Sequence, residues 1–242
     1  MNIQKSTLEL ENIQFLVLRK RIRNLHLIIR PPLGQVRVSA PVELSDEAIR
    51  AFIVPRLPWI RKHQLNFLNR PWHPPLKYET GERHFLWGRS FILKVISQEC
   101  PPRVELDENG GMHLYIRQRS RFDQREKAVI DWYRKELDTA IHKRLGYWEN
   151  IVGARADHWG IKRMKTRWGT CNPKARRIWL NVELAKKPEQ CLEYVIVHEL
   201  THLFERSHNH RFKAYMDAFM PQWRDIKKEL NQTGISRGSG EC

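Results

Sequence analysis

Two histidines four residues apart, with a glutamate beside the first, are the residues of this chain best placed to do chemistry. They are His198, Glu199 and His202, in the pattern H-E-x-x-H. On a helix, residues four apart share one face, so both imidazoles can bind one metal ion. Glu199 then lies where its carboxylate can take a proton from a water molecule. This arrangement is typical of zinc hydrolases and predicts a Zn2+ site with Glu199 as the catalytic base.

The motif lies within an apolar run, which predicts that its imidazoles are partly buried. Buried histidines need polar partners, and a metal ion supplies one. We therefore favour a metal site over an ordinary core helix with incidental histidines. The apolar residues of this run are Leu192, Val195, Ile196, Leu200 and Leu203.

A third ligand is expected from the segment after this helix. His208 follows His202 by six residues, which is the spacing of the metzincin pattern H-E-x-x-H-x-x-G-x-x-H. Glu205 stands where that pattern has Gly, so the route from His202 to His208 must differ. We expect the helix to end or bend near residue 207, with Asn209 capping the next helix and His208 returning to the metal. The alternatives to His208 are His210, Glu205, Asp217 and Glu229.

Several segments taken together resemble the YgjP-like metallopeptidase family, which is related to the SprT-like and WLM zinc peptidases. They are R-W-G-T-C at 167–171, I-W-L-N at 178–181, Pro188, Y-V-I-V-H-E-L-T-H-L at 194–203 and S-H-N-H-R-F at 207–212. The resemblance implies that His198, His202 and His208 bind zinc, that Glu199 is the catalytic base, and that proteins or peptides are the substrates.

The chain departs from the usual pattern of this family at three positions near the third histidine. Ser207 stands where the family has Asn, Asn209 where it has Ser, and Lys213 where it has Trp. Because Asn and Ser both cap helices well, we expect the first two changes to be tolerated. Loss of the Trp would open one wall of the site.

The segment around Gly169 suggests how a substrate would bind. In zincin-like sites a strand lies beside the metal helix, and its free edge can pair with an extended substrate. Gly169 would allow close approach of a backbone, and Arg167 would bind an anionic group or a carboxylate. We interpret Cys171 as a packing residue, because three imidazoles leave the open fourth position that catalysis needs. Trp168 and Trp179 are expected in the core.

The elements that must position this site are predicted from the periodicity of apolar residues and from turn residues. In the first 120 residues we expect strands at 13–18, 25–30 and 36–40, a helix from Ser45 to about 66, a linker at 70–75, and hairpins within 85–95 and 104–116. After these we expect a long amphipathic helix at 122–150, strands at 160–167 and 177–182 separated by a turn at 168–174, and the metal helix after Pro188.

This order of elements predicts an α+β fold. We expect a β-rich N-terminal region with one helical segment at residues 1–120. A zincin-like metallopeptidase domain of helices and a small antiparallel sheet would follow at 121–242, with a mobile Gly- and Ser-rich tail from residue 234.

The net charge of +16, from 43 Lys plus Arg against 27 Asp plus Glu, admits nucleic acids, nucleotides and acidic peptides as partners. The basic residues are spread along the chain, so a basic enzyme with no polyanion site is an equal interpretation. One alternative function is a metal-dependent nucleoside triphosphate (UTP) pyrophosphohydrolase, an activity attributed within the family, although no phosphate-cradling Gly loop is evident. The second alternative function is that of a nucleic-acid-binding protein with a degenerate metal site, but the intact set of metal ligands argues against it.

The four cysteines are scattered and form no C-x-x-C pair, which favours a reducing compartment. No apolar run is long enough to cross a membrane, and the first residues do not resemble a secretory signal. We therefore expect a cytoplasmic protein without membrane partners. No feature of the sequence sets an oligomeric state.

Overall fold

The computed structural model of the protein describes residues 4–30, 34–68 and 76–232, so the predicted linker and tail lie outside the described residues. The chain divides into two compact units at residues 74 and 75. The sequence placed this boundary near residue 120. The difference arises because the strands between 83 and 116 pack on the long helix that follows them, and so belong to the second unit.

The first unit is a four-stranded sheet covered by helices, in the strand order β1-β2-β4-β3. Apolar side chains on one face of the sheet, such as Phe15 and Val38, pack against Ile49 and Ile60 of the helices. The Ser45 side chain caps α1 by accepting a hydrogen bond from the backbone N–H of Ala48 at 3.2 Å. Its elements are β1 (Gln4–Leu10), β2 (Ile13–Lys20), β3 (His26–Arg30), β4 (Gln35–Pro41), α1 (Asp46–Ile53), η1 (Val54–Arg56) and α2 (Leu57–Leu68).

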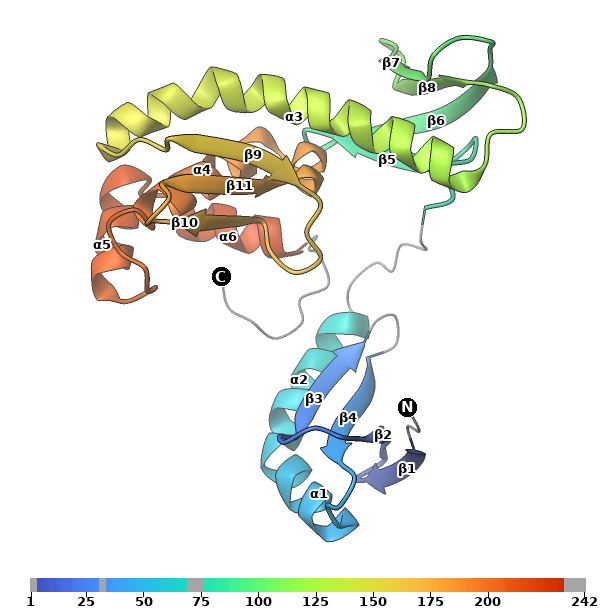
Figure 1. The fold of residues 1–242 in the computed structure, drawn as a ribbon, viewed down its shortest axis with the longest axis vertical. Helices are drawn as coiled ribbons and strands as arrows, with labels where there is room; N and C mark the ends of the chain where they lie inside the picture. Colours follow the sequence, from blue (N-terminus) through green and yellow to red (C-terminus); the bar gives the residue numbers. More distant parts are fainter. Residues whose placement is uncertain (1–3, 31–33, 69–75, 233–242) are drawn as a thin grey trace. The chain divides into compact units, whose positions relative to one another are not determined.

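The second unit begins with another four-stranded sheet, in the order β5-β6-β8-β7, followed by the helix α3 (Phe122–Val152). α3 runs past this sheet and past the three-stranded sheet that comes next (Figure 1). One stripe of α3 is buried, including Tyr133, Leu137 and Ile141, so the helix joins the two sheets into one core. The strands are β5 (Arg83–Leu86), β6 (Arg89–Ser97), β7 (Arg103–Leu106) and β8 (Gly111–Ile116).

The three-stranded sheet has the order β10-β11-β9, from β9 (His158–Lys162), β10 (Gly169–Asn172) and β11 (Arg177–Asn181). β10 pairs antiparallel with β11, whereas β9 pairs with it in parallel, so this sheet is mixed and not antiparallel as predicted. The sequence also predicted a turn over 168–174. Residues 169–172 instead form an edge strand, because the turn is confined to the residues between Asn172 and Arg177.

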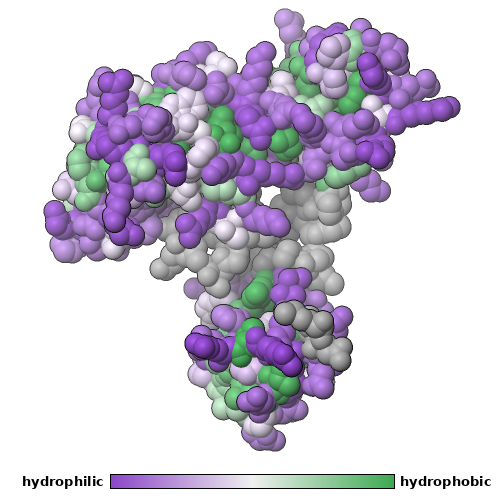
Figure 2. Space-filling model, viewed as in Figure 1, coloured by the Kyte–Doolittle hydropathy of each residue, from purple (hydrophilic) through white to green (hydrophobic). Residues whose placement is uncertain are grey.

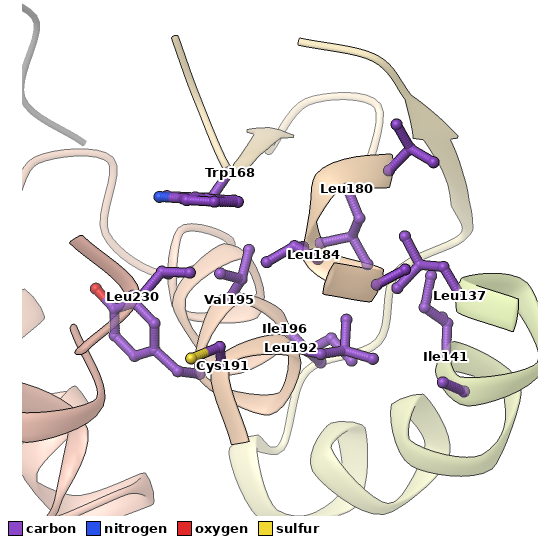
Figure 3. Packing of buried hydrophobic residues seen from close by; sticks show 14 of the residues in the cluster. Leu137, Ile141, Trp168, Leu180, Leu184, Cys191, Leu192, Val195, Ile196 and Leu230 are labelled. Atoms are coloured by element: carbon purple, nitrogen blue, oxygen red, sulfur yellow. The ribbon is translucent and has the colours of Figure 1, made fainter. Parts of the chain in front are cut away.

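The helix α4 (Glu189–Thr201) lies at the centre of this unit, and all its residues from Tyr194 to Thr201 are buried. A helix that is apolar on every side must be enclosed by other elements. Figure 3 shows Leu192 and Ile196 beside Leu137 and Ile141 of α3, and Val195 below Trp168 and Leu184. The remaining elements are η2 (Val182–Lys186), α5 (His210–Phe219) and α6 (Trp223–Gln232).

The α+β class predicted from the sequence is confirmed, with sheets concentrated in the N-terminal half and helices toward the C-terminus. Within the described ranges, no helix is long and apolar enough to cross a membrane.

Asn181, at the end of β11, ties the chain segment before β10 to the sheet. Its side-chain amide donates to the carbonyls of Met164 at 2.8 Å and Arg167 at 2.7 Å. Its side-chain oxygen accepts from the N–H of Glu183 at 3.2 Å, and its own N–H donates to the Trp168 carbonyl at 2.8 Å. Asn181 itself is fully buried, so its side chain makes these bonds away from water.

We predict that Asn181→Ala lowers the free energy of unfolding by about 3 kcal/mol, since it removes the side-chain partner of three backbone groups and leaves a buried cavity. Asn172→Ala is the matched control, because its exposed side chain accepts one bond, from the Ala175 N–H at 3.2 Å. Asn172→Ala should lower the free energy of unfolding by less than about 1 kcal/mol. Urea unfolding measures both, and equal losses in the two variants would contradict this role for Asn181.

Candidate metal site

The three predicted histidines meet where α4 ends and α5 begins. His198 lies in the last turn of α4, and His202 follows directly as the C-cap residue. The helix therefore ends about six residues earlier than the sequence predicted. The Asn209 side chain caps α5, as predicted, by accepting from the Phe212 N–H at 3.0 Å. This reversal of the chain brings His208 back to His198.

The ring nitrogens of His198, His202 and His208 lie within 4.8 Å of one another. Among the described residues, this is the one group of three or more His, Cys, Asp or Glu side chains that could hold a metal ion. None of the four rival ligands belongs to it. Asp217 instead pairs with Arg224 and accepts from the Trp223 indole, and Glu229 accepts from Gln190 at 2.6 Å.

One pair of donor atoms has a spacing close to that expected around a single metal ion. The Nε2 atoms of His198 and His208 are 3.0 Å apart. Two nitrogens bound to one tetrahedral zinc would be about 3.3 Å apart, given the usual Zn–N bond length. Burial, together with the neighbouring imidazoles of His202 and His208, holds the pKa of His198 well below its ordinary value. Burial also lowers the pKa of His202. The imidazoles of His198 and His202 are thus neutral, as metal binding requires.

Two contacts orient the rings so that Nε2 faces the centre of the group. The Nδ1 atom of His202 lies 2.9 Å from the carbonyl oxygen of Glu205, which can only accept, so Nδ1 carries the proton. The Nδ1 atom of His198 lies 3.5 Å from the Tyr194 hydroxyl. Phe212, which is 2% exposed, packs against all three imidazoles with ring centroids 4.8 to 5.0 Å away.

Glu199 is buried beside this group, with 4% of its surface exposed. Burial raises the pKa of its carboxyl to about 8, and the positive charge of Arg167 opposes this rise. A Cβ atom added to Gly169 would lie 2.5 Å from Oε1 of Glu199. Only glycine therefore fits at this position, and it brings the backbone of β10 against the carboxylate.

The structure thus accounts for Gly169 by its contact with Glu199, whereas the sequence analysis assigned it to approach of a substrate backbone. Arg167 is exposed, just before β10. Cys171 packs against the core and is absent from the histidine group. Burial and the nearby Glu199 raise the pKa of its thiol to about 12, so it is a neutral packing residue, as interpreted from the sequence.

Sequence reasoning missed three residues that position the site. Tyr194 precedes His198 by four residues, so the helical spacing already placed it on the same face. Phe212 stands three residues after the Asn209 cap, and the sequence assigned it no role in the site. The position of Asn181 among the backbone groups of 164–168 carries no local signal, because it depends on the pairing of β10 with β11.

One comparison with known proteins identifies a family for this chain. The family description "YgjP-like, metallopeptidase domain" matches residues 24–233. No curated protein matches the chain. One solved structure with partial similarity is that of the metallopeptidase zymogen abylysin from Pyrococcus abyssi. The two sequences are 20% identical, and the structures match with a TM-score of 0.34. The match covers 36% of this chain and 89% of the abylysin chain.

At that TM-score the similarity to abylysin supports no conclusion about the fold, so the assignment rests on the family match. That match includes the histidine group, Glu199 and β10. The chain belongs to the family of proteins with a YgjP-like metallopeptidase domain.

Proposed function

We propose that the protein is a zinc-dependent metallopeptidase in which His198, His202 and His208 hold Zn2+ and Glu199 is the general base. The observation that carries this proposal is the group of three imidazoles with the buried carboxyl group of Glu199 beside it. Nitrogen ligands in this number suit zinc and leave one position open. When bound, Zn2+ supplies a Lewis acid that polarises the scissile carbonyl and makes water a stronger nucleophile.

Glu199 is suited to moving the proton in this reaction. Its carboxylate lies against the Gly169 backbone, which restricts where its oxygens can go. In this position it takes a proton from the attacking water and delivers it to the leaving amine. Enclosure by α4 and β10 excludes bulk water from the carboxylate, which strengthens its electrostatic interactions with the reacting groups.

The substrate would bind along β10. This strand is at one edge of its sheet, so one side of its backbone has no strand partner among the described residues. An extended peptide can pair with such an edge, which would place a peptide bond beside Glu199. Arg167, exposed two residues before β10, would bind an anionic group of the substrate.

We predict that Glu199→Gln lowers peptide hydrolysis by at least about 100-fold, because the amide cannot accept the proton. Zinc content should be unchanged and thermal stability equal or higher, because burial disfavours the charge of the native carboxylate. Hydrolysis of a casein-like substrate, zinc analysis and thermal melts measure these effects. UTP hydrolysis by the native chain without any peptide cleavage would refute the peptidase proposal and favour the pyrophosphohydrolase.

His208→Ala should weaken zinc affinity by at least about 100-fold, since it removes one of three ligands. His210→Ala is the matched control, because His210 is an exposed histidine two residues away that lies outside the group. Competition with a chromogenic chelator measures both affinities. Equal affinities of the His208→Ala variant and the native chain would exclude His208 as a ligand.

A second candidate function, nucleic-acid binding, is favoured by the outer face of the three-stranded sheet. Residues 155–177 contain eight Lys or Arg and one Asp. Five of these cations form no ion pair among the described residues: Lys162, Lys165, Arg167, Lys174 and Arg177. Of these five, Lys162 and Arg177 lie beside Trp179 on this face, and Figure 2 shows hydrophilic residues over much of this unit.

Trp179 is at the middle of this face and not in the core, contrary to the prediction, whereas Trp168 is buried as predicted. The ring of Trp179 lies over Gly160 of β9, and the Lys162 ammonium is 3.6 Å from the centroid of this ring. Cations around a half-exposed aromatic ring are typical of surfaces that bind single-stranded nucleic acid.

For this face, we expect the double change Lys162→Glu and Arg177→Glu to weaken binding of a labelled oligothymidylate by at least about tenfold at low salt. Lys94→Glu, an exposed change on β6, should have an effect below about twofold. Fluorescence anisotropy over a salt series measures both. The nucleic-acid function is excluded if the native chain does not bind, or if the two variants lose affinity equally.

A further inference from the structure

A cavity of about 830 Å3 lies far along α3 from the histidine group, between the start of β7, the end of β8 and the first turns of α3. None of the three histidines, nor Glu199, lines it. α3 packs against β7 and β8 on this side and against α4 nearer its other end. The cavity is therefore a separate feature of the second unit.

The floor of this cavity, which we call the α3 groove, is apolar. Ile116 is 3% exposed, and Val104, Ala128 and Trp132 are partly buried against the main core. Pro101 and Pro102 extend this apolar lining. Cavities of this volume with mostly apolar walls and a few polar groups are typical of ligand sites.

The rim of the α3 groove carries an excess of positive charge. It contains five cations, Arg103, Arg117, Arg119, Lys127 and Lys135, but only two acids, Glu99 and Asp131.

Both acids of the rim are already paired. Glu99 lies 3.7 Å from Arg117, and Asp131 lies 2.5 Å from Lys127 and 2.6 Å from Arg134. A ligand would therefore meet a positive potential that the groove does not itself neutralise.

Two of these rim cations, Arg119 and Lys135, form no ion pair within the described part of the chain. Arg119 also has a φ of +61°. This left-handed conformation costs a non-glycine residue roughly 1 to 2 kcal/mol, and such strain is often stored at binding sites. The groove thus offers two unpaired cations above an apolar floor.

The neighbouring strand suggests the form of the occupant. β7 is the last strand of its sheet, so one of its edges lacks a strand partner among the described residues. Arg103 and Val104 belong to both β7 and the groove lining. Extended peptides dock at such edges, with main-chain hydrogen bonds providing affinity and side-chain pockets providing specificity. A nucleic acid would leave the apolar floor unused.

We propose that the α3 groove binds an extended peptide segment that alternates acidic and apolar side chains. The apolar side chains contact Val104, Ile116 and Trp132, and the carboxylates pair with Arg119 and Lys135. This binding does not depend on the proposed zinc chemistry.

The test uses the full chain carrying Glu199→Gln, so that hydrolysis cannot consume the probe. The probe is a fluorescein-labelled peptide of about twelve residues that alternates Glu with Val, followed by anisotropy. Arg119→Glu combined with Lys135→Glu should weaken its binding by at least about tenfold. Lys143→Glu is the matched control, because it reverses an exposed charge on α3 outside the groove, and should have an effect below about twofold.

Ala128→Phe tests the apolar floor separately, since it adds bulk to the groove without changing charge. It should also weaken binding by at least about tenfold, with the helical circular dichroism unchanged. A peptide with Gln in place of Glu should bind about tenfold more weakly than the probe. The proposal is wrong if the probe does not bind, if Lys143→Glu weakens binding as much as the double variant, or if oligothymidylate displaces the probe with equal affinity.

Discussion

The packing of α4 on all sides is the constraint on which the candidate site depends. Its apolar residues contact α3, the β9–β11 sheet, η2 and α6 in one continuous core. Such enclosure lets the helix carry His198 and Glu199 into the interior without exposing its backbone. The same enclosure removes water from both groups, which keeps the imidazole of His198 neutral and raises the pKa of Glu199.

Polar groups buried in this way require partners, and the surrounding elements provide them. The backbone of Glu205 accepts from His202, and the Tyr194 hydroxyl lies against His198. The Nε2 atoms of His198 and His208 lie 3.0 Å apart, close enough for both to bind one metal ion. The donor group therefore fits the metallopeptidase family to which the chain belongs.

Charge is distributed unevenly over the second unit, and its two basic surfaces differ in kind. The outer face of the β9–β11 sheet has unpaired cations around one half-exposed indole, without an apolar cavity. The α3 groove has fewer unpaired cations, but they stand above an apolar floor of considerable volume. Electrostatic attraction alone would bring polyanions to both surfaces. The apolar floor of the α3 groove is what favours an acidic peptide there.

The sequence by itself determined the parts of this protein that depend on local spacing. The H-E-x-x-H pattern placed His198 and His202 on one helical face, Asn209 marked the start of α5, and hairpin turns located β5 to β8. These features follow from helical period, capping and turn chemistry, which act over a few residues. The resemblance to the family likewise depended on contiguous residues.

Only the tertiary structure decided the features that depend on distant pairing. Residues 169–172 resembled a turn, and they become a strand because β11 offers them hydrogen bonds. Gly169 then meets Glu199, thirty residues away in the chain, at a distance no side chain could tolerate. The division near residue 75, the outward position of Trp179 and the α3 groove have the same origin. Each depends on which surfaces become buried together, and the spacing of residues along a chain does not specify that.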